Sequence, residues 1–362
     1  MDPAQRFRHR RDDAIAERDD LARRASRVSN LRLAVFGIGI GALVWAELQP
    51  ERGGWALALF GVALVAFITL IGVHSRLKER ERWAAEMAAV NDEALARLRR
   101  EWDGLPDVTE TDPPGHAYSR DLDIFGHGSL ARFLATTGTG VGRERLHAWL
   151  LAPAPASEVR TRQAAVRELV PELDFRQEIQ VAGRLAGDPD PEALESFLDW
   201  AESEPWLLRR KALLWASRLL PIASLVLLVL HLEGTLARPW WIWTLGAGAV
   251  LAMAFSKRLH RLMAGASLGD ASIRQYADLV ERIQARPFGS AALSEIHAAL
   301  TEDCDAAGEL EHIGWLTELA ELRHGGLFYV LIALPTLWDF HVLSALERWK
   351  AKAGRHVRAW AD

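Results

Sequence analysis

Several residue types and motifs that support well-known chemistries are scarce in this chain of 362 residues. The one cysteine, Cys304, permits no internal disulfide and no cysteine-based zinc site, which favours a reducing compartment. The twelve histidines form no His-Glu-x-x-His pattern, and no Gly-Lys dipeptide is present to end a phosphate-binding loop. A formal net charge of -5 excludes a global basic field for nucleic acid, although local basic patches remain open. The sequence therefore predicts no catalytic, cofactor-binding or metal-ligating residue in this chain.

Long apolar runs are the main feature that the chain does have. Half of its residues are hydrophobic, and the mean hydropathy of -0.01 averages very apolar stretches with strongly charged ones. Residues 31–48 and 55–73 each approach the length of a bilayer crossing, and the Pro/Gly-containing connector 49–54 is short enough to be only a turn. The two runs predict a transmembrane helical hairpin. A signal peptide is the competing interpretation, but no small-residue cleavage site separates the runs.

A second apolar pair, residues 212–232 and 239–256, predicts another transmembrane hairpin. Arginine and lysine flank both pairs on the side away from the connectors, so the positive-inside rule places the N- and C-termini in the cytoplasm. We therefore expect an integral protein of the inner or cytoplasmic membrane. A buried soluble hairpin is the alternative for the second pair. Tryptophans that would lie near the outer membrane interface are Trp45, Trp55, Trp240, Trp241 and Trp243.

The remaining sequence predicts an all-α fold. It is rich in alanine, leucine, arginine and glutamate, with apolar residues three and four positions apart and no alternation typical of strands. A helix over 80–102 is expected to continue the second membrane helix, whereas the apolar run 327–337 is too short to cross a bilayer and predicts a buried core helix. Ser129 and Ser290 are predicted helix N-caps.

These patterns divide the chain into six segments. They are a charged cytoplasmic arm at 1–30, transmembrane hairpin 1 at 31–73, a juxtamembrane helix and Pro/Gly linker at 74–119, a helical segment at 120–208, transmembrane hairpin 2 at 209–258 and a helical segment at 259–362.

The motifs Gly128-Ser129-Leu130, Thr137-x-Thr139-x-x-Gly142-Arg143 and Leu146-x-x-Trp149-Leu150-x-x-Pro153 follow one another in the sequence. In order and spacing they resemble motifs of the MutS family of DNA mismatch repair ATPases. Residues 121–153 are similar to the start of the MutS core domain in the order and spacing of their motifs, and 162–169 is similar to the helix that follows. Residues 337–360 resemble the lever that leads into the family's ATPase domain. We expect mainly packing and capping roles for the residues that carry these motifs: Asp121, Leu122, Gly128, Ser129, Leu130, Thr137, Thr139, Gly142, Arg143, Leu146, Trp149, Leu150, Pro153, Trp338, Asp339, Glu347 and Trp349.

The resemblance implies that the two long helical segments form a MutS-core-like and lever-like cytoplasmic domain, into which hairpin 2 is inserted. ATP and Mg²⁺ are implied only for an ATPase domain, for which this chain has no phosphate-binding loop. The sequence stops where the resemblance places the start of that domain. This chain is then expected not to be an enzyme, while a longer gene product would be an ATPase. Mismatch recognition is not expected, because no Phe-x-Glu wedge is present.

Different classes of function remain open. The leading hypothesis is a membrane-anchored MutS-like protein whose core and lever couple an ATPase domain to the membrane. The alternative is a non-catalytic membrane scaffold that dimerises through its helical domain. A small transporter is a third interpretation, but its intramembrane polar candidates, Arg218 and His231, both lie near helix ends. The expected partners are the lipid bilayer and a second copy of the chain; DNA binding stays open, with little support from the charge balance.

Overall fold

The computed structural model describes residues 2–49, 53–106, 113–268, 273–302, 305–322 and 333–361, and these residues are mainly helical with no strand among them. The α-helices, in chain order, are α1 (Pro3–Leu48), α2 (Gly53–Arg99), α3 (Leu130–Leu134), α4 (Gly140–Leu151), α5 (Ala156–Leu169), α6 (Leu173–Ala186), α7 (Pro191–Glu202), α8 (Lys211–Leu232), α9 (Trp241–Ala264), α10 (Ile273–Gln284), α11 (Ala291–Thr301), α12 (Ala306–Glu321), α14 (Leu334–Thr336), α15 (Trp338–Ala353) and α16 (Val357–Ala361). Two short 3-10 helices, η2 (Trp102–Gly104) and η5 (Gly354–His356), lie between them.

The chain divides into two compact units. Unit 1 contains Met1–Gly138, Gly142–Pro153 and Asp174–Leu185; unit 2 contains Thr139–Val141, Ala154–Leu173 and Ala186–Asp362. This division differs from the six segments expected from the sequence, because most of α4 and α6 joins the N-terminal helices while α5 joins the C-terminal half.

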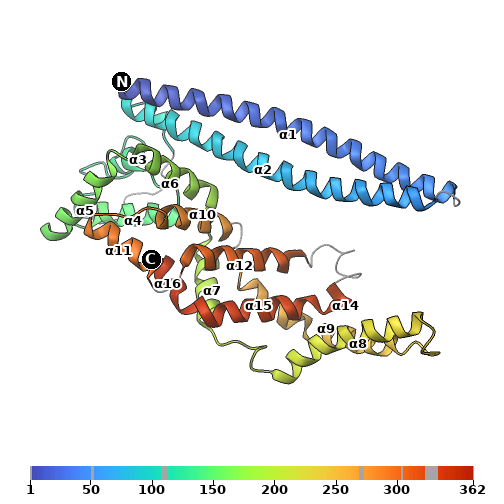
Figure 1. Cartoon of the computed structure of the whole chain (residues 1–362). Helices are drawn as coiled ribbons and strands as arrows, with labels where there is room; N and C mark the ends of the chain where they lie inside the picture. The colour runs from blue at the N-terminus through green and yellow to red at the C-terminus, as the bar shows by residue number, and fades with distance from the viewer. Residues whose placement is uncertain are drawn as a thin grey trace. The chain divides into compact units, whose positions relative to one another are not determined.

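Two long helices, α1 and α2, run side by side in unit 1 (Figure 1). They contain 46 and 47 residues, which at 1.5 Å per residue makes each about 70 Å long. The charged arm at 1–30 and the predicted helix over 80–102 are therefore continuous with the apolar runs. The second of these helices ends at Arg99, slightly earlier than expected, because the ends of helices fray and are the least certain part of a sequence-based expectation.

Small residues line the contact between α1 and α2. Gly39 and Ala42 of α1 are buried there, as are Ala56 and Ala63 of α2. A Cβ atom added at Gly39 would lie 3.5 Å from the Cβ of Ala63, so the two backbones approach closely. Small residues at such contacts are the usual means by which helices associate inside a bilayer, where lipid leaves no hydrophobic force to join them.

Among the residues that the structure describes, three helices, α1, α2 and α8, are long and apolar enough to cross a membrane. Only 11% of the most apolar window of α1, 11% of that of α2 and 6% of that of α8 is buried inside the protein. Water-exposed apolar surface on this scale is unusual in a soluble protein and is compatible with membrane association. The fourth expected crossing, on α9, is not among these helices, so the number of membrane hairpins stays a prediction.

Residues of the motif block 121–153 form a small apolar cluster in unit 1. It contains Ile124, Phe125, Ala131 and Ala135. The rings of His147 and Phe125 meet edge to face at a centroid distance of 5.1 Å, and burial lowers the pKa of His147 below its ordinary value.

Unit 2 is built around α15. This helix contacts α8, α9 and α12, and its buried face includes Phe340, Leu343, Leu346 and Trp349. The pattern of buried residues three and four positions apart is that of an amphipathic helix with one face toward the core. The largest core cluster of the described residues therefore joins the C-terminal helices to the α8–α9 pair.

The two predicted N-caps, Ser129 and Ser290, differ in the contacts that their side chains make. Ser129 caps α3, since its Oγ accepts a hydrogen bond from the Arg132 amide at 3.2 Å. Ser290 occupies the N-cap position of α11, as predicted, although its side chain makes no capping hydrogen bond. The Glu168 carboxylate instead accepts from the amides of Gly289 and Ser290 at 2.7 and 2.8 Å.

The predicted core helix over 327–337 falls largely outside the described residues. Of its described end, α14 covers only Leu334–Thr336, and Leu337 adopts a left-handed conformation with φ of 53°. Leu337 is buried and directly precedes α15, so the chain turns there before the helix begins.

Candidate functional site

A buried polar contact in unit 2 links α15 to the segment that enters α8. The Glu347 side chain is almost completely buried, with 2% of its surface exposed. One carboxylate oxygen accepts hydrogen bonds from the backbone amides of Trp206 and Leu207 at 2.7 and 2.8 Å. The other accepts from the amides of Leu207 and Leu208, both at 2.8 Å.

This arrangement explains how a charge is tolerated in the core. A buried carboxylate is costly unless several donors satisfy it, and hydrogen bonds to a charged acceptor are about twice as strong as neutral ones. The three amides precede α8, which begins at Lys211, so they have no carbonyl of that helix as an acceptor. Glu347 thereby fixes α15 to the backbone immediately before the α8–α9 pair.

A buried lysine one turn further along α15 reinforces this connection. The Nζ atom of Lys350 donates to the Ser203 Oγ at 2.6 Å and lies 5.1 Å from the ring centroid of Trp200. Burial lowers the pKa of Lys350 below its ordinary value of 10.5, while Glu347 opposes the shift. Trp200 also stacks on Trp349 with a centroid distance of 6.2 Å.

Trp206 extends the connection into α9. Its ring centroid lies 5.7 Å from that of Phe255, which in turn meets Phe340 of α15 at 6.3 Å. The guanidinium carbons of Arg210 and Arg258 lie 4.6 and 4.9 Å from the Trp206 ring centroid. We call this set of contacts around Glu347, Lys350 and Trp206 the α15 junction. It joins α15 to the start of α8 and to the later turns of α9.

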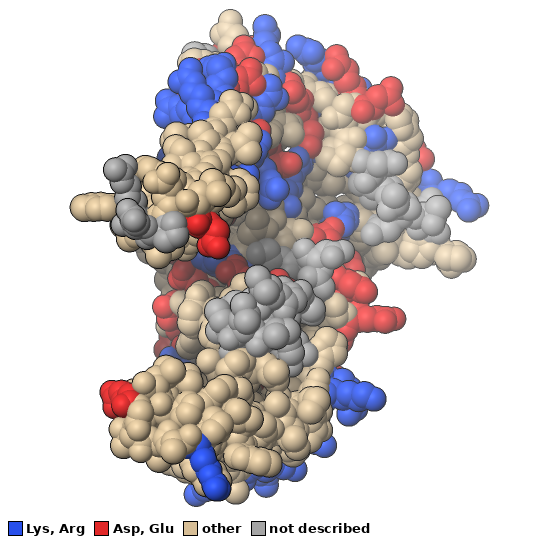
Figure 2. All heavy atoms as spheres, turned by 90° about the vertical axis from the view of Figure 1, so that its right-hand side faces the viewer, with Lys and Arg blue, Asp and Glu red and all other residues tan. Residues whose placement is uncertain are grey.

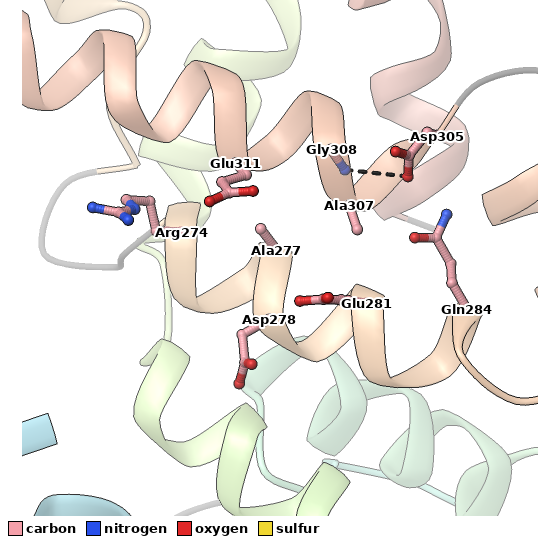
Figure 3. Close-up of a pocket in the computed structure, with 9 residues that line it drawn as sticks. All are labelled: Arg274, Ala277, Asp278, Glu281, Gln284, Asp305, Ala307, Gly308 and Glu311. Atoms are coloured by element: carbon pink, nitrogen blue, oxygen red, sulfur yellow. Dashed lines mark hydrogen bonds between the residues drawn. The ribbon is translucent and has the colours of Figure 1, made fainter. Parts of the chain in front are cut away.

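An open pocket of about 390 Å³ lies between α10 and α12. Its polar lining includes Arg274, Asp278 and Glu281 of α10 with Asp305 and Glu311, and in Figure 3 the Arg274 and Asp278 side chains extend away from α12. Asp305 already accepts the Gly308 amide at 3.2 Å as the cap of α12, and Asp278 pairs with Arg282. Within the described residues no group of three or more histidine, cysteine or acidic residues could hold a metal ion.

The motif residues of 121–153 do not converge on one site. Among the motif residues of this block only Ser129 is buried, while Leu122, Leu130 and Trp149 are exposed apolar side chains. The residues that are likewise exposed or only partly buried are Asp121, Gly128, Thr137, Thr139, Gly142, Arg143, Leu146, Leu150 and Pro153. The structure gives Ser129 a capping contact and packs Leu150 against the cluster of Ile124 and Phe125.

The C-terminal motif residues lie in or near the α15 junction. Glu347 and Trp349 are buried, and the Trp349 Nε1 donates to the Glu309 carbonyl at 2.9 Å. The Trp338 Nε1 donates to the Leu319 carbonyl at 3.0 Å, and Asp339 is partly buried in the first turn of α15. These contacts tie α15 to α12.

Sequence reasoning missed Ser203, Trp206 and Lys350. The signals in the sequence were the indole just before the basic run 209–211 and a lysine on the buried stripe of an otherwise amphipathic helix. Neither signal identifies its partner, because the contacting residues are about 140 positions apart in the chain.

Comparison of the chain with protein-family models, with curated proteins and with solved structures yields no match. The geometry of the α15 junction and of the apolar helices is therefore the basis for a functional proposal.

Proposed function

We propose that this chain is the membrane-anchored core and lever of a MutS-like protein, which couples a C-terminal ATPase domain to the bilayer. The chain itself has no nucleotide site in this proposal. ATP and Mg²⁺ belong to the ATPase domain of a longer gene product, and a second copy of the chain is the expected partner. A DNA-related role is compatible with the motifs but has no support from the charge balance.

The observation that carries the proposal is the α15 junction. A lever must transmit a displacement without slack, which requires directional contacts rather than purely apolar ones. Three amides on one buried carboxylate provide such contacts between α15, the lever-like helix, and the entry to α8. Sliding of α15 along its axis would break these hydrogen bonds or carry the start of α8 with it.

The proposed topology has four crossings and cytoplasmic termini. Support for including α9 comes from its pairing with α8, in which the Ser224 hydroxyl donates to the Thr244 hydroxyl oxygen at 2.9 Å. Met253 and Trp243 of α9 are strongly exposed, as expected for side chains that face lipid. The lower part of Figure 2 shows the end of the α8–α9 pair at which the chain passes from one helix to the other. Most residues on this surface are uncharged. Such a surface suits the bilayer interior and its outer interface.

Hydrogen exchange on the complete gene product, reconstituted in nanodiscs, tests this function. We expect ATP with Mg²⁺ to change the protection of the amides of 206–208 and of the first turn of α8. The corresponding amides in the apolar half of α1 are expected to stay unchanged and serve as the internal control.

An unchanged exchange pattern at 206–208, in a protein shown to bind ATP, would contradict the proposed coupling. If the complete gene product encodes no Gly-Lys-Ser or Gly-Lys-Thr loop, the non-catalytic membrane scaffold would replace the proposal. Its test is then the mass of the assembly in detergent, where a dimer through the helical domain is expected.

A further inference from the structure

Six cations from two separate parts of unit 2 gather at one end of the α8–α9 pair. Three precede or begin α8, and three lie on the last turns of α9. The two helices are antiparallel neighbours, so the start of one meets the end of the other. We call this group the basic collar; its members, all exposed, are Arg209, Arg210, Lys211, Lys257, Arg258 and Arg261.

Trp206 organises the centre of the collar. Arg210 approaches its ring from the α8 side of the chain and Arg258 from α9, with guanidinium carbons 4.6 and 4.9 Å from the ring centroid. Arg210 also donates to the Trp206 carbonyl at 2.8 Å. An arginine stacked on an indole is held in place through its flat face, which leaves its in-plane N–H groups for hydrogen bonds, one of which Arg210 makes to the Trp206 carbonyl. Two such forks suit an oxygen-rich anion such as a phosphate diester.

Few acidic groups oppose these charges. Between residues 203 and 261 the carboxylates are Glu204 and Glu233, and Glu204 pairs with Arg209. Glu233 lies at the other end of the pair, just after α8. Glu347 approaches the same segment, but its oxygens accept three backbone amides. The collar therefore keeps a strong positive excess.

The collar borders a broad apolar surface. Going along α8 away from it, Trp215 is 56% exposed and Leu225 is 63% exposed. The Arg218 guanidinium carbon lies 5.8 Å from the Trp215 ring centroid, an arrangement that suits an arginine at a membrane interface. If the apolar surface lies in the bilayer, the collar lies at the depth of the lipid phosphates.

We propose that the basic collar binds the headgroups of anionic phospholipids, with Arg210 and Arg258 on Trp206 as its phosphate-binding centre. This inference rests on the proposed membrane insertion of the α8–α9 pair. A headgroup bound there contacts two arginines that stack on Trp206, the residue whose amide is held by Glu347. Lipid charge and the position of α15 are thereby connected through Trp206.

The test reconstitutes the full chain with an equimolar mixture of phosphatidylglycerol and phosphatidylcholine, and measures the ratio of the two lipids that remain after mild detergent extraction. We expect retention of phosphatidylglycerol over phosphatidylcholine by about fivefold or more, the effect of about one effective cation near an anionic surface. The triple substitution Lys257→Gln, Arg258→Gln, Arg261→Gln is expected to bring the ratio close to one.

Two further variants separate a built site from general charge. The triple substitution Arg160→Gln, Arg162→Gln, Arg167→Gln removes the same charge from α5 of the same unit, and it should leave the retained ratio unchanged. Arg258→Lys keeps the charge but loses the planar fork, and a partial loss is expected. Full retention in Arg258→Lys, or an equal loss in the α5 variant, would overturn the proposed centre.

A separate experiment measures whether the α8–α9 pair crosses the membrane, independently of its lipid preference. A cysteine placed at Thr235, in the α8–α9 connection, is labelled from the outer side in a Cys304→Ser background if the pair crosses the membrane. Labelling without phosphatidylglycerol retention overturns the headgroup site alone, whereas absence of outside labelling contradicts the proposed topology. Duplex DNA binding that is lost in the collar variant, without lipid retention, would make the collar a nucleic-acid surface and also overturn the inference.

Discussion

The two apolar helix pairs are connected to their polar surroundings in different ways. The α1–α2 pair simply continues: each helix runs unbroken from its apolar half into a charged half. The α8–α9 pair stops close to its apolar part and is fixed by the α15 junction to a separate helix. We call the α1–α2 pair the rod, because its helices are continuous. We call the connection of the α8–α9 pair to α15 the joint. A rod resists bending along its length, whereas a joint can pass a displacement from one helix to another.

The polar half of the rod has its own fastening, supplied by α6. The Arg10 Nε donates to Gln177 at 2.8 Å, and the Gln177 amide donates to the Asn91 Oδ1 at 2.9 Å. Asn91, which is fully buried, donates in turn to the Met87 carbonyl at 2.8 Å. Two side-chain amides and the Arg10 guanidinium carry this chain of hydrogen bonds, while a buried carboxylate carries the α15 junction. We therefore expect unequal costs when each is broken.

The largest effect is expected for Glu347→Ala. The substitution leaves three buried backbone amides without their acceptor, and the loss of stability should be about 3–5 kcal/mol. Thermal unfolding in detergent micelles measures the change, and hydrogen exchange should show faster exchange at 206–208. Glu311→Ala, an exposed carboxylate of α12, is the matched control and should change little. Equal stabilities of the two variants would show that the joint is not held by Glu347.

A smaller effect is expected for Gly39→Leu in the rod. The added side chain would meet Ala63 and Phe60, whose atoms lie 3.5 and 3.8 Å from an added Cβ, and overpacking should cost about 1–3 kcal/mol. Gly37→Leu and Gly41→Leu place the same side chain where no atom lies within 4 Å of the Cβ. Thermal unfolding in micelles should therefore separate Gly39→Leu from both controls. If all three behave alike, α1 and α2 do not pack through Gly39.

Gln177→Ala should weaken the fastening of the rod by about 1–3 kcal/mol, because the buried Asn91 loses a partner. Hydrogen exchange is expected to rise near residue 91 and at α6, but not at 206–208. A double-mutant cycle with Asn91→Ala isolates the pair, for which a coupling of at least about 0.5 kcal/mol is expected. Loss of protection at both fastenings would contradict their independence.

The smallest effect is expected for Lys350→Met. Removing a partly desolvated charge offsets the lost contacts with Ser203 and Trp200, so the net change near neutral pH should be within about 1 kcal/mol. The pKa of Lys350 is lowered in the folded protein, so the folded state releases this proton at lower pH than the unfolded state. The parent should therefore gain stability relative to Lys350→Met as the pH rises toward 10.5. Unfolding curves of both proteins across this range measure the difference. If the parent instead loses stability relative to Lys350→Met as the pH rises, burial does not lower the pKa of Lys350.

Part of the fold was predictable because it depends on neighbours in the chain. The apolar runs and the cap at Ser129 are local features, and the helical period over 80–102 correctly continued the second long helix. Ser290 takes the predicted N-cap position without a side-chain cap, and no local signal predicted that its own amide is accepted by Glu168, more than a hundred residues away. The run 239–256 shows the limit for membrane segments, since α9 forms as a helix but falls outside those apolar and long enough to cross by composition.

The sequence by itself determined that the chain is helical, where its lipid-compatible surfaces lie and which ends of the apolar runs carry arginine and lysine, because these follow from residue type and spacing along one helix. Only the tertiary structure decided that Glu347 holds the entry to α8, that α6 fastens the rod and that Trp206 receives an arginine from each side of the pair. These contacts join residues far apart in the chain, and their energy comes from burial and directed hydrogen bonds that exist only once the helices are packed together.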